Sequence, residues 1–310
     1  MPGNHGPSAQ TLLESPARGG YREPMIFRIL LLIAGVFFCS TAVIFIRESS
    51  EHVILLSSYR LLVAAIALTP LFIRDYKRQA VRVLAPHIML GVVPGILLGI
   101  HFISWIKAAR MTTAVNASLI VNLSPIVMPF ILFYMIRERI TKRELIGTAL
   151  AVAGVLVLSA ADFNVSRRYF WGDVLCFGSM LFLTFYLALG RRNKHLESIW
   201  LYVVPLFYIA GIMCFFIALF FVNPIKPYSV REIALILALG IVPTVFGHSI
   251  LNYSLKHMKG QIISIFIMTQ FIFAGVMAYF IWRELPGLSF YFASILVLGG
   301  AVLAIERNNG

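Results

Sequence analysis

Residues 149–158 read Ala-Leu-Ala-Val-Ala-Gly-Val-Leu-Val-Leu, a run without a single polar side chain. A strand of a membrane β-barrel alternates polar and apolar positions, so this run is typical of a helix that is apolar on every side. The whole chain has the same character, since 60% of its 310 residues are apolar and only 13% are charged. This balance excludes an ordinary soluble domain and predicts an all-α polytopic membrane protein.

Further apolar runs, bounded by charges or by Gly, Pro and Asn, divide the chain into possible spans. A helix needs about 20 residues to cross roughly 30 Å of hydrocarbon, and the runs are close to that length. We therefore predict ten transmembrane helices, a disordered cytoplasmic tail at 1–25 and a cytoplasmic C-terminal tail at 307–310. The runs lie near 26–46, 53–73, 84–106, 112–136, 144–161, 169–189, 198–222, 230–251, 260–282 and 288–305.

The two halves of the chain resemble each other. A shift of 146 positions superposes Arg137-Glu138 on Arg283-Glu284 and Ala153-Gly154 on Gly299-Gly300, which indicates an internal duplication. Since each half has an odd number of spans, the two copies enter the membrane from opposite sides. We predict two inverted five-helix repeats, at 26–161 and 162–306, an arrangement common in secondary transporters.

A second, weaker sequence similarity between the halves supports the duplication. The sequence Gly-Val-Val-Pro at 91–94 is followed by His101, and Gly-Ile-Val-Pro at 240–243 is followed by His248. Gly91, Gly95 and Gly99 recur every four residues, which favours close helix packing within one subunit and, as an alternative, dimerisation. A monomer or a homodimer is therefore expected.

The positive charges predict the orientation of the chain. With both termini inside, seventeen Lys and Arg residues fall on the cytoplasmic side and eight on the other, in line with the positive-inside rule. The formal net charge of +13 is thus explained by topology, and no nucleic-acid partner is expected. A bacterial inner membrane fits a short tail without a targeting signal.

Three stretches carry a family resemblance: Ala-Ser-Leu-Ile-Val-Asn-Leu-Ser-Pro at 117–125, Arg-Glu-Arg-Ile-Thr-Lys-Arg-Glu-Leu-Ile-Gly at 137–147, and Arg283-Glu284-Leu285 before Gly299-Gly300. They resemble the EamA-type family of the drug/metabolite transporter superfamily, over about 26–306. The resemblance implies a ten-helix carrier of two inverted repeats around a central cavity, usually exporting amino acids or other small metabolites.

Arg60 is the strongest candidate for a substrate-binding residue, because it lies about two turns inside the second span. A guanidinium there can hold a substrate carboxylate or phosphate bidentately. The alternative is that it extends to the interface or bonds backbone carbonyls. Trp105, by contrast, is expected at the membrane interface, where tryptophan is enriched.

Other polar residues in the spans complete the predicted substrate site. Each can contact a small polar or amphipathic metabolite, or it can form a hydrogen bond that only fixes helix packing. The histidines can also couple transport to protons, because imidazole titrates near physiological pH. The candidates besides Arg60 are His101, Asn116, Asn122, His248 and Gln270.

The thirteen carboxylates lie in the tail, in connections or near span ends, so a carboxylate proton relay in mid-membrane is not expected. Glu138 and Glu284 are candidates for gating by ion pairs between the repeats, although charges at such places commonly just mark the interface. No phosphate loop, hydrolase motif or metal-ligand spacing is found. We expect no cofactor, no metal site and no catalytic residue.

Together these features predict a secondary transporter that exports a small metabolite, such as an amino acid, by alternating access across the lipid bilayer. An intramembrane transferase acting on a lipid-linked substrate is the alternative from another class. That alternative would need a paired His/Asp or Arg/Glu constellation at one interface.

Overall fold

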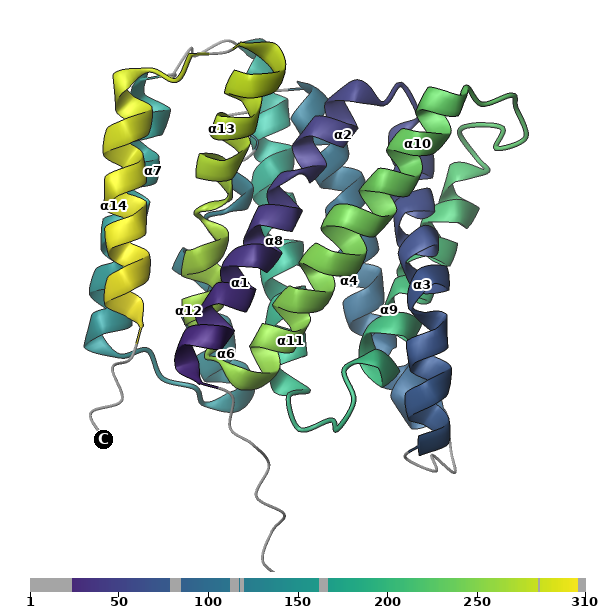
Figure 1. Ribbon diagram of the computed structural model, residues 1–310, viewed down its shortest axis with the longest axis horizontal. Helices are drawn as coiled ribbons and strands as arrows, with labels where there is room; N and C mark the ends of the chain where they lie inside the picture. Colours follow the sequence, from purple (N-terminus) through teal and green to yellow (C-terminus); the bar gives the residue numbers. More distant parts are fainter. Residues whose placement is uncertain are drawn as a thin grey trace, which may run out of the picture.

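The computed structural model describes residues 24–78, 85–111, 117, 120–161, 167–283 and 285–305, and every regular element in these ranges is a helix (Figure 1). The helices of the first half are α1 (Met25–Ser40), α2 (Ala42–Glu48), α3 (Val53–Arg78), α4 (Ala85–Met111), α6 (Ser124–Ile136) and α7 (Lys142–Ala161). Those of the second half are α8 (Arg167–Arg192), α9 (Trp200–Ala218), α10 (Val230–Leu239), the π-helix η1 (Gly240–His248), α11 (Ser249–His257), α12 (Gly260–Ile267), α13 (Gln270–Trp282) and α14 (Leu288–Ala304).

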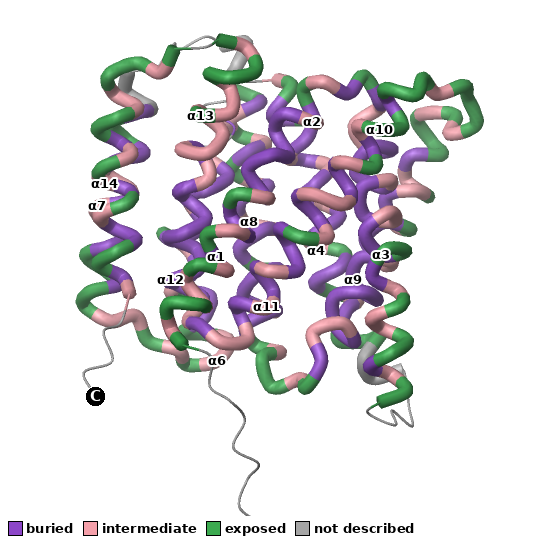
Figure 2. The backbone as a smooth tube through the Cα atoms, in the orientation of Figure 1, coloured by how far each residue is buried: buried purple, intermediate pink, exposed green. Residues whose placement is uncertain are grey.

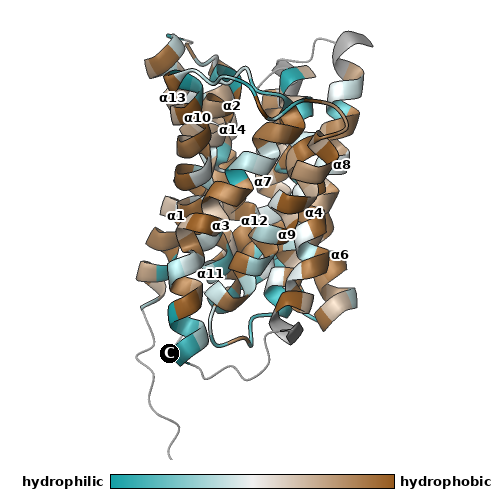
Figure 3. Ribbon diagram, turned by 90° about the vertical axis from the view of Figure 1, so that its right-hand side faces the viewer, coloured by the Kyte–Doolittle hydropathy of each residue, from teal (hydrophilic) through white to brown (hydrophobic). Residues whose placement is uncertain are grey.

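Seven helical segments in the described ranges are long and apolar enough to cross a membrane. Figure 3 shows the matching distribution, with hydrophobic residues along the helices and hydrophilic ones gathered toward both ends of the bundle. The prediction of an all-helical membrane protein is confirmed, while the number of ten spans stays a prediction. The seven segments are Met25–Glu48, Val53–Arg78, Ile88–Met111, Phe170–Arg192, Trp200–Ala218, Val230–His257 and Gly260–Trp282, and two shorter apolar helices are Ser124–Ile136 and Leu288–Ala304.

Helix contacts repeat between the two halves when each helix is exchanged for its counterpart. Thus α3 packs against η1 as α9 packs against α4, and α1 packs against η1 and α11 as α8 packs against α4. Similarly, α1 contacts α13 as α8 contacts α6. In Figure 1, α1 runs upward from Met25 whereas α8 runs downward to Arg192, so the two halves have opposite directions. This is the geometry of an inverted repeat.

Backbone conformation marks the same duplication. Among the described residues, only Arg137 (φ 56°) and Arg283 (φ 57°) combine a side chain with a positive φ. They end α6 and α13 in the left-handed conformation, and they are 146 positions apart. A left-handed residue other than glycine is uncommon, so its occurrence at both equivalent positions supports the repeat predicted from the sequence.

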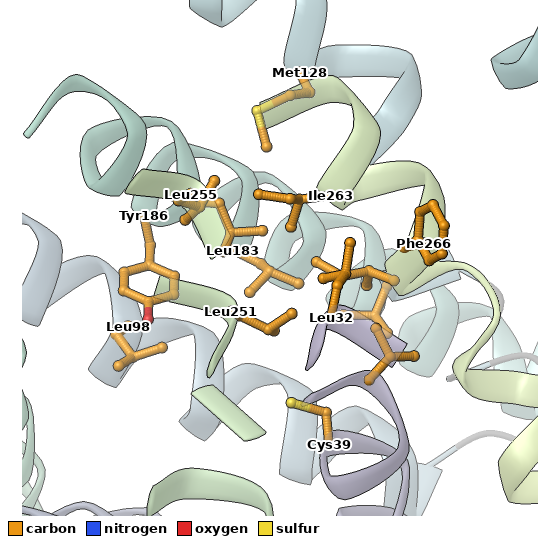
Figure 4. Close-up of a cluster of buried hydrophobic side chains, with 14 of the residues drawn as sticks. Leu32, Cys39, Leu98, Met128, Leu183, Tyr186, Leu251, Leu255, Ile263 and Phe266 are labelled. Carbon is orange, nitrogen blue, oxygen red and sulfur yellow. The ribbon is translucent and has the colours of Figure 1, made fainter. Parts of the chain in front are cut away.

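The core of the bundle is apolar and is shared by both halves. Figure 4 shows part of it, where Leu98 and Tyr186 lie beside Leu251 and Cys39. Large apolar side chains are also exposed around the outside, and Figure 2 marks exposed positions along α14 and α10. Exposed apolar surface on membrane-length helices is suited to contact with lipid chains.

Helices α7 and α14 form a tightly packed pair at one side of the bundle (Figure 1). A Cβ atom added at Gly147 would lie 2.5 Å from the carbonyl oxygen of Gly300, and one at Gly154 would lie 2.8 Å from that of Ala293. Small residues are what allow two membrane helices to approach so closely. Gly147 and Gly154 therefore allow α7 and α14 to pack closely.

Replacing Gly147 with alanine is expected to lower the thermal unfolding midpoint of the detergent-solubilised protein by several degrees. The added methyl meets rigid backbone, and such overpacking costs about 1–3 kcal/mol. Gly178→Ala is the matched control, because an added Cβ there meets no atom within 4 Å. Equal midpoints for the two variants would contradict the packing argument.

Candidate functional site

A small cavity of about 40 Å³ lies among helices of both halves. Its volume is close to that of one or two water molecules in the liquid. Five of the six predicted substrate-binding residues line it, and the sixth, Asn116, lies outside the described residues. The lining residues are Cys39, Ala42, Arg60, His101, Phe102, Trp105, Val121, Asn122, Leu183, His248, Leu251, Ile267 and Gln270.

Arg60, on α3, directs its guanidinium into this cavity and is 1% exposed. Its Nε and Nη2 donate hydrogen bonds of 3.1 and 3.0 Å to the hydroxyl of Thr244 in the other repeat. Its Cζ lies 3.8 Å from the ring centroid of Phe102, a cation–π contact that fixes the plane of the guanidinium. The side chain is buried, and among the described residues its hydrogen bonds go to the Thr244 hydroxyl.

The π-helix η1 positions both Thr244 and His248. Thr244 donates its hydroxyl proton to the carbonyl of Leu239, five residues earlier, at 2.9 Å. In a π-helix residues five apart share a face, whereas in an α-helix residues seven apart do. The proline-to-histidine distance is five residues from Pro243 to His248 and seven from Pro94 to His101. The change of helix type therefore keeps each histidine on the same face as its proline in both repeats.

His101 is held by Ser179 of α8. Its Nδ1 lies 3.0 Å from the Ser179 carbonyl oxygen, and the Ser179 hydroxyl donates to the His101 carbonyl at 3.0 Å. A ring that donates from Nδ1 and is neutral has Nε2 as its acceptor. One nitrogen of His101 thus makes the interhelical packing contact, while the ring stacks on Trp105 at 6.2 Å between centroids.

His248 is less restrained. Its ring contacts Phe102 edge to face, with centroids 5.2 Å apart, and its Nδ1 has no hydrogen-bond partner among the described residues. Arg60 Nη1 and Trp105 Nε1 are likewise buried without a partner there. Buried polar groups are normally satisfied, so three unpaired nitrogens around one cavity indicate a place for a polar ligand.

Sequence reasoning missed three residues of this site. Trp105, which was expected at the membrane interface, lines the cavity. Phe102 stacks on Arg60 but resembles any other apolar residue of its span. Thr244 bonds Arg60 from a distant part of the chain. The proline within its span was the only signal near Thr244.

Glu138 joins helices of the two repeats at one end of the bundle, the lower end in Figure 1. Its Oε2 lies 2.7 Å from Nε of Arg191, at the end of α8, and its Oε1 accepts a hydrogen bond of 3.1 Å from the backbone N–H of Gly260. Arg191 also donates to the carbonyl of Leu255 at 3.0 Å. Glu138 therefore joins the first repeat to two elements of the second, α8 and α12. Glu284, its counterpart, lies outside the described residues.

At the opposite end, the connection between α2 and α3 contacts residues of the second repeat. Glu232 of α10 accepts hydrogen bonds from the hydroxyls of Ser49 and Ser50, and Lys226 pairs with the buried Glu51 at 2.7 Å. Arg110 donates to the carbonyls of Glu51 and Ser49 at 2.8 and 3.0 Å. Hydrogen bonds and an ion pair thus join the two repeats at this end too.

Beside this connection, the hydroxyls of Tyr59 and Tyr228 lie 3.0 Å apart. Burial, followed by this hydrogen bond, raises the pKa of the Tyr228 phenol. The phenol therefore stays protonated at physiological pH.

The sequence profile of the EamA-like transporter family matches the chain twice, at residues 26–160 and 170–305. The chain belongs to this family. EamA-like proteins form part of the drug/metabolite transporter superfamily, and the two matches agree with the duplicated helix contacts. Membership and the membrane-length helices identify the chain as an integral membrane protein and support a transporter.

Relatives of known sequence are similar but distant. An "Uncharacterized transporter" of Archaeoglobus fulgidus is 24% identical over 208 residues, which cover 65% of this chain and 70% of the relative. A second one from the same organism is 23% identical over 270 residues, covering 85% and 91%. A solved structure titled "Crystal structure of protein" superposes with a TM-score of 0.73 at 17% identity, over 90% of this chain and 96% of the other. The last similarity shows that the fold is shared.

Replacing Thr244 with valine is expected to lower the free energy of unfolding by about 1–3 kcal/mol, because two buried donors of Arg60 lose their acceptor while the shape is kept. Thr184→Val is the control, since Thr184 is equally buried but its hydroxyl bonds only Met180 of its own helix. The measurement is thermal unfolding in detergent. Equal losses in both variants would show that the Thr244 hydroxyl does not support Arg60.

Proposed function

We propose that this EamA-like protein is a secondary transporter that exports a small metabolite by alternating access around the central cavity. The observation that carries the proposal is the cavity itself, which is lined by Arg60 and His101 of one repeat and by His248 and Gln270 of the other. A site shared by two inverted repeats can be exposed to either side when the repeats rock against each other.

The contacts at the two ends support the same mechanism. Glu138 with Arg191 at one end and Glu51 with Lys226 at the other both join the two repeats. Since the cavity measures only about 40 Å³, which suits a few water molecules, a metabolite requires the repeats to separate at one end. We propose that the Glu138 contacts are lost when the lower end opens. The distribution of Lys and Arg predicts that this end faces the cytoplasm, in a bacterial inner membrane.

The transferase alternative gains no support from the cavity. A transferase would need a paired His/Asp or Arg/Glu constellation at one interface. The Arg/Glu pairs at the two ends, Glu138 with Arg191 and Glu48 with Arg231, join the two repeats, and no carboxylate is among the described residues that line the cavity. Its thiol, that of Cys39, lies among apolar neighbours of the core. We therefore retain the transporter as the function that the geometry supports best, with protons as a coupling ion through the histidines.

Counterflow in proteoliposomes tests this proposal. Vesicles holding the purified full chain are loaded with a pool of amino acids, organic acids and other small metabolites, and the contents are followed by mass spectrometry with and without a pH gradient. Selective loss of one chemical class, unchanged in structure, is expected. Conversion of a compound into a new product would favour the transferase, and loss at the rate of protein-free vesicles would contradict transport of the pool.

A further inference from the structure

The central cavity holds a positive charge that no carboxylate of the described residues neutralises. Arg60 is fully enclosed, and its hydrogen-bond acceptor, Thr244, is a neutral hydroxyl. An ionised side chain in a low-dielectric site costs several kcal/mol unless an opposite charge lies close to it. A counter-charge is therefore expected at this place.

The described part of the chain supplies no carboxylate for that purpose. None of the described lining residues is acidic, and residues 112–116 and 118–119, which precede the lining residues Val121 and Asn122, contain no Asp or Glu in the sequence. The carboxylates nearest to the site in sequence, such as Glu48 and Glu51, are engaged at the end of the bundle with Arg231 and Lys226. The missing negative charge has to come from a ligand.

The remaining groups of the cavity describe that ligand further. Nη1 of Arg60, Nε1 of Trp105 and Nδ1 of His248 are the buried nitrogens without partners among the described lining residues, and two of these, in Arg60 and Trp105, are obligate donors. Carboxylate oxygens are the acceptors that suit a guanidinium best. The rest of the lining is apolar, from side chains such as Leu183 and Leu251.

We propose that the transported substrate is a small organic monoanion, with one carboxylate held by Arg60 Nη1, an apolar body and no ammonium group. The inference rests on the proposed transport function and narrows its substrate class. An amino acid carries an ammonium group that would lie near the positive charge of Arg60, and no described lining residue is a carboxylate that could pair with it. Monocarboxylates such as 2-oxo acids match the charge and the apolar lining of the site, and the repeats must separate to admit them. Zwitterions with the same carbon skeleton do not match the charge.

The test compares three compounds with one skeleton: 4-methyl-2-oxopentanoate, leucine, and 4-methylpentanamide. Binding is measured first, as the shift in thermal unfolding of the detergent-solubilised full chain, and counterflow second. We expect the 2-oxo acid to bind at least about tenfold more tightly than the other two, since a charge-assisted hydrogen bond contributes about 1.5–3 kcal/mol. Arg60→Gln should remove this preference.

The outcomes separate the inference from the function on which it rests. If leucine is bound or exchanged with the same affinity as the 2-oxo acid, the inference of a monoanionic substrate is overturned. The proposed transport function is then unaffected. Binding of the 2-oxo acid without counterflow supports the anion site and contradicts transport. If neither the 2-oxo acid nor a panel of straight-chain monocarboxylates shifts unfolding, the anion site is wrong, whatever the pool experiment gives.

Discussion

Exchange of Arg60 for glutamine is expected to weaken binding of the anionic substrate by about a hundredfold or more. Loss of a buried charge partner costs about 3–5 kcal/mol when the opposite charge stays in place, and here that charge belongs to the bound carboxylate. Glutamine keeps a donor for Thr244 but carries no charge. The measurement is the substrate concentration that gives half of the maximal thermal shift, together with the counterflow rate.

The same variant should leave the unfolding temperature of the substrate-free protein unchanged or higher. The reason is that it removes a cation enclosed without a counter-charge, and buried charges of this kind are retained for function at a cost in stability. Arg60→Lys should recover part of the affinity, since it restores charge without the planar fork of donors. A fall in stability with unchanged affinity would show that Arg60 is a packing residue.

Arg74→Gln serves as the matched control for Arg60→Gln. It removes an arginine from the same helix, but its side chain is 59% exposed at the lower end and pairs with the adjacent Asp75. Exposed ion pairs contribute about 0–1 kcal/mol, so substrate affinity and unfolding temperature should both stay at the values of the unmodified protein.

The polar residues that line this cavity could be selected from the sequence for a simple reason. In an apolar span, a charge or an imidazole is so costly that it stands out, which is why Arg60, His101 and His248 are identifiable from the pattern of residues alone. Phe102 and Thr244 were not identifiable, since phenylalanine and threonine are ordinary in membrane helices and their contacts join residues far apart in the chain.

Local backbone geometry was the other part that the sequence did not provide. The expected span at 230–251 is an α-helix that becomes the π-helix η1 and then α11, and the span at 260–282 is broken at Met268 and Thr269 between α12 and α13. Both features depend on packing against neighbouring helices, which hydropathy does not record.

The second large effect is expected at Glu138. Replacing it with glutamine removes the charge that pairs with Arg191, whose side chain is only 10% exposed. Loss of one partner of such a buried pair costs about 3–5 kcal/mol. If the contact holds the lower end closed, the substitution destabilises the closed state alone. Even a part of that free energy then shifts the ratio of open to closed molecules more than tenfold.

Cys39 offers a natural reporter for this shift, because it is 7% exposed and lines the central cavity. In a Cys176→Ala, Cys214→Ala background it is the single thiol of the chain. Glu138→Gln should speed its reaction with a membrane-impermeant maleimide at least about tenfold from the lower side and slow it from the upper side. Arg192→Gln, which changes the exposed neighbour of Arg191, is the control and should leave both rates unchanged. Equal labelling rates in Glu138→Gln and the control would mean that Glu138 stabilises the bundle without controlling access, since a contact broken only on opening must change how often the cavity is reached.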